Sequence, residues 1–345
     1  MLQVGIIGLG MMGQMHLAAW AATKGARVGM VADSDPRRAA GDFSGAWSNL
    51  AGGAKGLDFS RIRATGDAMA LIHDPAVDVV DICVPTPAHT ELALAAIRAG
   101  KHVLCEKPLA RTSADARRIA AAAERGAGLF MPAMCVRFWP EWAWLAKAVR
   151  EETYGKVISA EFRRVGTLPP GWFRDGKLSG GAILDLHLHD TDFVHHVFGS
   201  PAAVSSGGWT GPTGCIDHIH TRYLYPDGPV VTAEGSWAAA PTLPFEMSYR
   251  VFFERATADY RLGREGGDLL LHGPSKVTAV RCAKTDGYRA ELAYFVDCIR
   301  ANRPPETVTA TQVAHSIRIV EAEAKSALTG RIVKVPTSRA GQRAA

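Results

Sequence analysis

Apolar runs alternate with helical patterns over the first 125 residues. Four runs of mainly apolar residues predict strands: residues 2–8, 27–33, 78–85 and 102–106. Three segments have helical patterns: residues 12–24, 88–99 and 113–124. Strands that alternate with helices predict a parallel sheet covered on both faces, so this part of the chain is predicted to be α/β. Ser113 is the predicted N-cap of the third helix.

The pattern changes after Gly128. Residues 128–138 and 156–165 predict two strands with a helix over 141–152 between them, and a Gly- and Pro-rich loop precedes a helix through 184–198. From about residue 202 to 282, strand follows strand with short turns, which predicts a large, mostly antiparallel sheet. Three last elements are predicted: helices over 289–301 and 309–328, and a strand over 331–335.

The length of 345 residues suits two domains better than one core. We expect an α/β domain over residues 1–125 and an α+β domain over 126–337. The small polar tail, residues 338–345, is predicted to be disordered.

Composition narrows the class of protein. A hydrophobic fraction of 47%, a charged fraction of 21% and a net charge of +5 are ordinary, and no Lys/Arg block suggests nucleic acid or an anionic membrane. The apolar start lacks a basic segment and is broken by glycines, unlike a signal peptide, and no run is long enough to cross a membrane. The six cysteines form no CxxC pair and are predicted to be reduced, in a cytoplasmic protein.

The first strand runs directly into a glycine motif, Gly8-Leu-Gly10-Met-Met-Gly13, which opens a helix. In a dinucleotide-binding turn, Gly8 allows the tight turn, Gly10 lets a pyrophosphate approach the backbone, and Gly13 lets helix and strand pack closely. The helix N-terminus supplies N–H groups for the phosphates. A glycine-rich turn without a ligand is the alternative.

Asp33 ends the second strand, near the spacing at which a carboxylate accepts hydrogen bonds from the ribose hydroxyls of the cofactor. A carboxylate there repels a 2′-phosphate, so NAD is expected rather than NADP. Arg37 and Arg38 complicate this prediction, because they are close enough to neutralise a phosphate.

Two further stretches carry chemistry. One is Glu106-Lys107-Pro108 after a strand, and the other is Asp185-Leu-His187-Leu-His189 after a Gly-Gly pair. Together with the glycine motif, they resemble the glucose–fructose oxidoreductase / inositol dehydrogenase family (Gfo/Idh/MocA), and the resemblance covers nearly the whole chain. It implies a Rossmann domain that binds a nicotinamide cofactor, and a second domain that covers the nicotinamide and contacts the substrate.

The resemblance also implies catalytic positions. Lys107 matches the active-site lysine, and Asp185 and His189 match the other two catalytic residues. Many members have Gly where this chain has His187, which either adds a polar group near the substrate or only changes the packing of the helix.

The residue chemistry agrees with these roles. Oxidation of an alcohol removes a hydride, which the cofactor takes, and a proton, which the protein must take. His189 is the expected acid/base because imidazole titrates near neutral pH. Asp185 is four residues away, hence on the same helix face if the helix is regular. Lys107 is expected to bind the reacting oxygen. Each residue alone is equally compatible with an ordinary solvated surface.

Other residues complete the predicted site. The cofactor site is expected to comprise the following residues: Gly8, Gly10, Met11, Met12, Gly13, Asp33, Pro85, Thr86, His89, Glu106 and Lys107. The substrate site is expected to comprise another set: Lys107, Arg137, Trp172, Arg174, Asp185 and His189. Trp172 and Phe173 either stack on a sugar ring or anchor their loop to the core. His218, beside Asp217, is either a site residue or a core histidine.

The His- and Asp-rich segment 187–196 raises the possibility of a metal site. His187 and His189 lie on different faces of a regular helix, and hydride transfer to NAD requires no metal, so none is expected.

The expected activity is the NAD-dependent oxidation of a hydroxyl of a sugar or cyclic polyol. Two alternatives stay open: a redox-neutral enzyme that uses NAD transiently to cleave or modify a sugar, and a non-catalytic dinucleotide or sugar sensor. A sheet with helices on one side leaves apolar strand residues to be covered, which predicts a homodimer or homotetramer.

Overall fold

The computed structural model describes residues 1–44 and 58–336. The chain forms two compact units. The first comprises Met1–Trp139 and Thr285–Ala314, and the second comprises Pro140–Lys284 and the chain from His315 onward. Residues 126–139, assigned above to the second domain, therefore lie with the parallel sheet. The tail, residues 338–345, lies outside the described residues.

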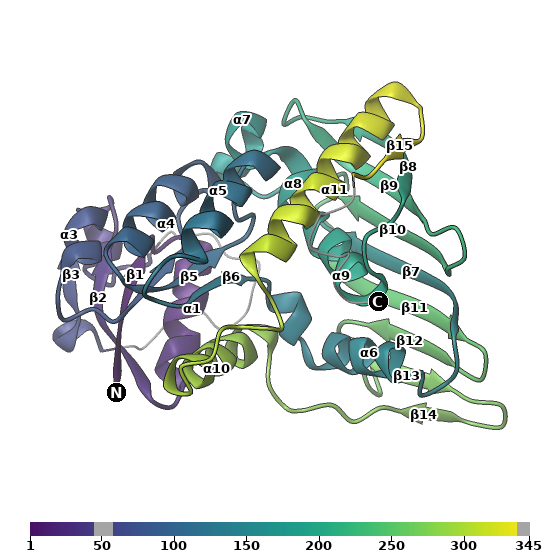
Figure 1. Cartoon of the computed structure of the whole chain (residues 1–345), viewed down its shortest axis with the longest axis horizontal. Coiled ribbons are helices and arrows are strands. Elements are labelled where there is room, and N and C mark those ends of the chain that lie inside the picture. Colours follow the sequence, from purple (N-terminus) through teal and green to yellow (C-terminus); the bar gives the residue numbers. More distant parts are fainter. Residues whose placement is uncertain (45–57, 337–345) are drawn as a thin grey trace. The chain divides into compact units, whose positions relative to one another are not determined.

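The first unit is built on a six-stranded sheet of order β3-β2-β1-β4-β5-β6, in which every pair is parallel (Figure 1). This order places the switch in strand direction beside β1, as in a Rossmann fold. The strands have the following bounds: β1 Leu2–Ile7, β2 Ala26–Ala32, β3 Arg63–Thr65, β4 Val79–Ile82, β5 His102–Glu106 and β6 Phe130–Ala133.

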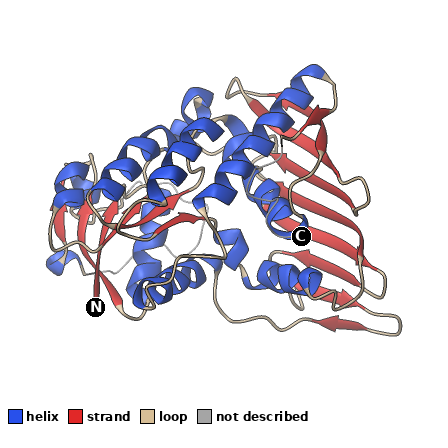
Figure 2. Cartoon of the chain, in the orientation of Figure 1, coloured by secondary structure: helices blue, strands red, loops and turns tan. Residues whose placement is uncertain are grey.

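Helices cover both faces of this sheet, with α4 and α5 packed together on one face and α1 against α10 on the other (Figure 2). The helices of the unit have the following bounds: α1 Met11–Ala22, α2 Pro36–Ala39, α3 Ala68–His73, α4 His89–Arg98, α5 Ser113–Ala123 and α10 Gly287–Arg300. Three short 3₁₀ turns complete it: η1 Phe59–Arg61, η2 Thr86–Ala88 and η3 Cys135–Phe138. The predicted α/β class of this part is confirmed.

The second unit is built on a nine-stranded sheet of order β14-β13-β12-β11-β7-β10-β9-β8-β15. All pairs are antiparallel except β7 with β10, so the predicted mostly antiparallel sheet is confirmed. The strands have the following bounds: β7 Val157–Val165, β8 Ala203–Thr210, β9 Ile216–Leu224, β10 Val230–Ser236, β11 Glu246–Phe253, β12 Thr257–Arg261, β13 Leu269–His272, β14 Val277–Ala279 and β15 Val333–Lys334.

The helices of this unit lie on one face of its sheet (Figure 2). They have the following bounds: α6 Pro140–Arg150, η4 Gly171–Arg174, α7 Gly176–Ser179, α8 Gly181–Asp185 and α9 Leu188–Phe198, with α11 Ala310–Thr329 running on from the first unit. No helix of the described residues is both long and apolar enough to cross a membrane.

The core of the second unit is centred on Trp142, which is fully buried. The ring of Phe193 meets it edge-on at a centroid distance of 4.7 Å, and Tyr249 does so at 5.2 Å. Packing of this kind stabilises beyond buried area alone, so these rings fix α6 and α9 on the sheet.

The outward face of the nine-stranded sheet carries ion pairs between strands as well as exposed apolar side chains, and the expectation that another chain covers it stays a prediction. Arg163 pairs with Glu234 (2.6 Å) and Glu246 (3.3 Å), which lie on the two strands adjacent to its own. Large apolar side chains do reach solvent, with Trp209 and Val230 each half exposed. Cross-strand ion pairs therefore suit this face to water.

Two predicted local features are wrong. Thr112, not Ser113, caps α5, because the Thr112 hydroxyl accepts from the N–H of Asp115. The predicted strand 128–138 ends at Ala133 and turns into η3, since Met134 leaves the extended conformation.

Candidate active site

The glycine turn between β1 and α1 has the geometry of a dinucleotide-binding turn. Gly8 adopts a φ of +89°, which favours glycine. A Cβ on Gly13 would collide with the carbonyl oxygen of Gly8, whereas a Cβ on Gly10 would meet no atom within 4 Å. The space beside Gly10 is therefore open to a phosphate, and no side chain caps the N-terminus of α1. These residues fit the pyrophosphate of NAD.

Asp33 joins this turn to the end of β2. Its carboxylate accepts from the N–H of Leu9 at 2.7 Å and from the N–H of Asp35 at 2.8 Å. Arg38 donates to both of its oxygens, at 2.8 and 3.1 Å, whereas Arg37 pairs with Asp35 instead. Arg38, rather than Arg37, thus neutralises the Asp33 carboxylate and reduces the repulsion that this carboxylate would exert on a 2′-phosphate.

Lys107 follows the last residue of β5, at the carboxyl edge of the parallel sheet, where ligands of such sheets bind. Its N–H donates to Oε2 of Glu106 at 2.8 Å. On the other side, a ring nitrogen of His89 lies 2.8 Å from the carbonyl oxygen of Pro108, and the other ring nitrogen lies 2.7 Å from that of Val84. Burial lowers the pKa of His89. The main chain around Lys107 is therefore held from both sides.

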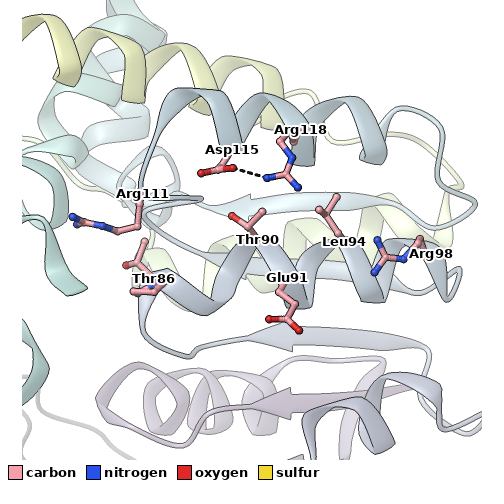
Figure 3. Close-up of a pocket in the computed structure, with 9 residues that line it drawn as sticks. Thr86, Thr90, Glu91, Leu94, Arg98, Arg111, Asp115 and Arg118 are labelled. Carbon is pink, nitrogen blue, oxygen red and sulfur yellow. Dashed lines mark hydrogen bonds and ion pairs between the residues drawn. The ribbon is translucent and has the colours of Figure 1, made fainter. Parts of the chain in front are cut away.

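A polar pocket of about 400 Å³ lies between α4 and α5 (Figure 3). Thr86 lines it and is 1% exposed, while Arg118 donates to Asp115 on its α5 side at 2.7 Å. None of Lys107, Asp185 and His189 lines this pocket, so it is separate from the predicted catalytic residues.

Asp185 and His189 belong to the second unit, whereas Lys107 belongs to the first. The prediction that Asp185 and His189 share one regular helix is wrong. Asp185 ends α8, α9 begins at Leu188, and the N–H of His187 donates five residues back to Ala182 at 2.8 Å. Because of this wide turn, the two side chains do not have the relative positions of residues four apart on a regular helix. Such turns are frequent at functional sites.

Buried Asp217 holds the start of α8. It accepts from the N–H of Ala182 (3.2 Å) and from the hydroxyl of Thr213 (2.7 Å). Gly181 has a φ of +74°, and a Cβ there would lie 2.6 Å from Cys215. The Gly-Gly pair and Asp217 thus fix the first residues of α8, the short helix that ends at Asp185. His218, next along β9, lies on its outward face opposite Trp209 and Ser236.

His187 is a packing residue. Its ring is fully buried, and a Cβ built on Gly235 of β10 would lie 2.6 Å from the His187 Cβ. Neither ring nitrogen has a hydrogen-bond partner among the described residues, and Nε2 lies 3.6 Å from Oε2 of Glu323. Of the two possibilities considered above, the altered helix packing is the one that the contacts support.

The predicted substrate residues differ in exposure. Arg137 is buried and donates to the carbonyl of Thr307 (2.8 Å) and to Gln312 (2.9 Å). The ring of Trp172 stacks on Phe173 at 4.2 Å, and Phe173 meets Trp237 edge-on at 6.1 Å. Phe173 is therefore the loop anchor, while Trp172 forms the outer layer of the stack and Arg174 is exposed.

The His- and Asp-rich segment is divided among separate partners. Asp190 pairs with Arg164 of β7 at 2.9 Å, and Asp192 accepts from Ser316, whose Oγ also contacts His195 at 3.0 Å. Among the described residues, one trio brings three potential metal-ligand atoms within 4.8 Å, namely His16, Asp81 and Cys83 in the first unit. Burial raises the pKa of the Cys83 thiol, which disfavours the thiolate that metals bind.

Two models of one oxidoreductase family match the chain. The model described as an oxidoreductase family with an NAD-binding Rossmann fold matches residues 2–133, and the GFO/IDH/MocA C-terminal domain matches residues 142–259. The chain belongs to the GFO/IDH/MocA family of oxidoreductases. The resemblance that the motifs indicated is confirmed, and the first unit is an NAD-binding domain.

Relatives of this GFO/IDH/MocA chain include enzymes named for sugars and inositol, as well as trans-1,2-dihydrobenzene-1,2-diol dehydrogenases. The 1,5-anhydro-D-fructose reductase of Ensifer adhaerens is 29% identical over 77% of this chain and 82% of the reductase. Inositol 2-dehydrogenase 2 of Saccharopolyspora erythraea is 31% identical over 65% of this chain and 62% of that enzyme. A solved complex of levoglucosan dehydrogenase with NADH and levoglucosan superposes with a TM-score of 0.83 over 97% of this chain and all of its own, at 23% identity, which shows the shared fold.

Several buried polar residues near the site were not predicted. His16, Asp81 and Glu291 cluster in the first unit, and Asp217 and Glu323 lie in the second. One signal existed, because Asp81 interrupts an apolar strand and a buried carboxylate needs partners. The sequence spacing gave no indication of which partners these are.

Proposed function

We propose that this family member oxidises a hydroxyl group of a sugar or cyclic polyol, with NAD as the hydride acceptor. The observation that carries the proposal is the position of Lys107. It directly follows β5 at the carboxyl edge of an NAD-binding sheet, where Glu106 accepts from its N–H and His89 contacts the carbonyl oxygen of the next residue, Pro108. The relatives that act on sugars and inositol support the substrate class.

The proposed division of labour follows from the chemistry of each side chain. The cofactor supplies the hydride acceptor. His189 takes the hydroxyl proton, because an imidazole is the side chain suited to accept a proton near neutral pH. Lys107 donates a hydrogen bond to the reacting oxygen, and Asp185 orients His189 or binds a substrate hydroxyl.

Trp172 is the proposed aromatic contact to the sugar ring, since its ring is the outer layer of a stack whose inner ring anchors the loop. Exposed Arg174 is the proposed polar contact. Arg137, which donates to Thr307 and Gln312, is proposed to shape the pocket as well as to contact substrate.

We also propose a cytoplasmic location and a homodimer or homotetramer. None of the six cysteines, all within the described ranges, forms a disulfide, as expected in a reducing compartment. Light scattering would measure the assembly against the chain mass of 36.9 kDa.

The test is a substrate panel. Purified protein is mixed with NAD or NADP and with inositols, aldoses, anhydrosugars, sugar acids and deoxy sugars, and reduced cofactor is followed at about 340 nm. We expect turnover of at least one sugar or polyol, with kcat/KM higher for NAD. No turnover across the panel, with NAD binding shown by calorimetry, would contradict the proposal and favour a redox-neutral enzyme or a sensor.

A further inference from the structure

A buried ionic network lies behind Lys107 in the first unit. The imidazole of His16, on α1, is fully buried between two carboxylates. Its Nδ1 lies 2.9 Å from Oδ2 of Asp81 on β4, and its Nε2 lies 2.9 Å from Oε1 of Glu106 on β5. Trp20, one turn further along α1, donates to Oδ2 of Asp81 at 2.7 Å. The network joins one helix to two neighbouring strands.

The contacts define the charge state of His16. Each ring nitrogen faces a carboxylate oxygen, and both nitrogens donate only in the imidazolium form. Burial lowers the pKa of His16, but the Asp81 charge and hydrogen bond outweigh it, so that the pKa is raised well above its usual value. The network therefore places an imidazolium between two carboxyl groups, with one ring N–H directed at each.

Glu106 connects this network to the main chain of Lys107. One carboxylate oxygen faces His16, and the other accepts from the N–H of Lys107 at 2.8 Å. With both oxygens engaged and 4% of the residue exposed, the carboxylate is fixed in one orientation. Both of these contacts are with the protein.

The network starts at the helix that the glycine turn opens. His16 lies three residues after Gly13, so the same helix that offers its N-terminus to the pyrophosphate also carries the imidazolium. The chain of contacts runs from α1 through Glu106 to the backbone of Lys107. These contacts link the position of α1 to that of Lys107.

Stability alone gives little reason for such a network. Burying charges is costly, and well-packed apolar residues in place of a buried ion network are often as stable or more so. Glu291 of α10 adds to the cost, because it is buried near these groups and neither of its oxygens has a hydrogen-bond partner among the described residues. The benefit must therefore lie in geometry.

We propose that Glu106, His16 and Asp81 are positioning residues for Lys107, and that they hold its main chain in register with the helix of the NAD-binding turn. This inference rests on the proposed catalytic role of Lys107. Glu106 acts through Lys107 and not as a ligand of the cofactor.

The experiment compares kcat, NAD affinity and amide exchange in variants of the full chain. Glu106→Ala is expected to lower kcat about 100-fold, the loss that a misplacement of about 1 Å produces, while Kd for NAD changes less than twofold. Glu106→Gln keeps an oxygen that accepts from the N–H of Lys107, so it is expected to restore part of this activity. His16→Gln is expected to lower kcat without lowering NAD affinity in proportion.

A matched control separates positioning from general damage. His102→Asn changes a half-buried histidine at the other end of β5, where its ring accepts from the N–H of Leu129. It is expected to change kcat less than threefold, whatever its effect on thermal stability.

A double-mutant cycle tests whether Glu106 acts through Lys107. In a Lys107→Met background, Glu106→Ala should lower the residual kcat less than twofold, because the group that it positions is gone. If Glu106→Ala keeps full kcat, lowers kcat equally in that background, or weakens NAD binding as much as it lowers kcat, the inference is wrong. Unchanged turnover in Lys107→Met alone would instead refute the proposed function.

A readout without turnover completes the test. Hydrogen–deuterium exchange of the Lys107 amide should be at least tenfold faster in Glu106→Ala than in Glu106→Gln, whether or not a substrate is known. Equal exchange in the two variants would overturn the proposed link.

Discussion

The end of β5 and the joint between α8 and α9 each position a candidate catalytic residue, and they do so through different contacts. Both place a candidate catalytic side chain beside a buried ion pair. At the end of β5, Glu106 bonds directly to the N–H of Lys107. At the joint, Arg164 of β7 instead forms an ion pair with Asp190, the residue after His189, and this pair attaches the first turn of α9 to β7.

The difference teaches where each ion pair should matter. A carboxylate that bonds to the candidate catalytic residue itself controls the position of one group, so its loss should appear in kcat. A pair that fastens a helix to a sheet controls the packing of a whole element, so its loss should appear first in stability.

The sharpest test removes the candidate catalytic group of the first region. Lys107→Met should lower kcat/KM about 1,000-fold, because a charged donor to the reacting oxygen is lost. Steady-state kinetics would measure this, with NAD affinity unchanged by calorimetry. Lys24→Met, the same change at an exposed position of the same unit, is the control. A loss of less than threefold at Lys107 would contradict its role.

The equivalent change in the second region is His189→Asn, which removes the proposed proton acceptor. General base catalysis contributes about 100-fold or more, so kcat should fall by at least that factor. His220→Asn, on the exposed outward face of β9, should leave kcat within twofold. Equal effects of the two substitutions would mean that His189 is not the base.

Arg164→Met tests whether the ion pair of the second region acts mainly on stability. It leaves the buried Asp190 carboxylate without its partner, which costs about 3–5 kcal/mol of the free energy of unfolding. Thermal and urea unfolding would measure the loss, and adding Asp190→Leu should recover much of it. Arg250→Met removes an exposed pair with Asp259 and should cost about 1 kcal/mol or less. Similar costs for both arginine variants would contradict the role of the buried pair.

The smallest expected effect concerns Glu291. Burial raises the pKa of Glu291 well above its usual value, with Glu106 and Asp81 acting in the same direction and His16 opposing them. The unfolded chain ionises this group from about pH 4.5, whereas burial keeps the proton bound to a higher pH in the folded chain, so this group lowers stability as pH rises.

Glu291→Gln should therefore stabilise the protein at pH 8 more than at pH 5, as measured by unfolding at both pH values. Exposed Glu151→Gln should show no such trend. A gain that does not grow with pH would mean that Glu291 is ionised in the folded protein.

The sequence specified the parts of the site that depend on local rules. The glycine turn needs Gly8 and Gly13 for steric reasons within a few residues, and β5 matched its prediction at both ends. Wherever the outcome depended on three-dimensional packing, prediction was poorer. The wide turn before α9 was missed because a regular helix was assumed, and no spacing rule could pair His16 with Glu106, 90 residues away.

The contact between His187 and Gly235 also couples the residue choice at two positions. A Cβ built on Gly235 would lie 2.6 Å from the His187 Cβ, so any residue other than glycine at 187 leaves no room for a side chain at 235. The two positions are therefore expected to vary together among relatives. Which residues can stand at the helix joint thus depends on the absence of a side chain on β10.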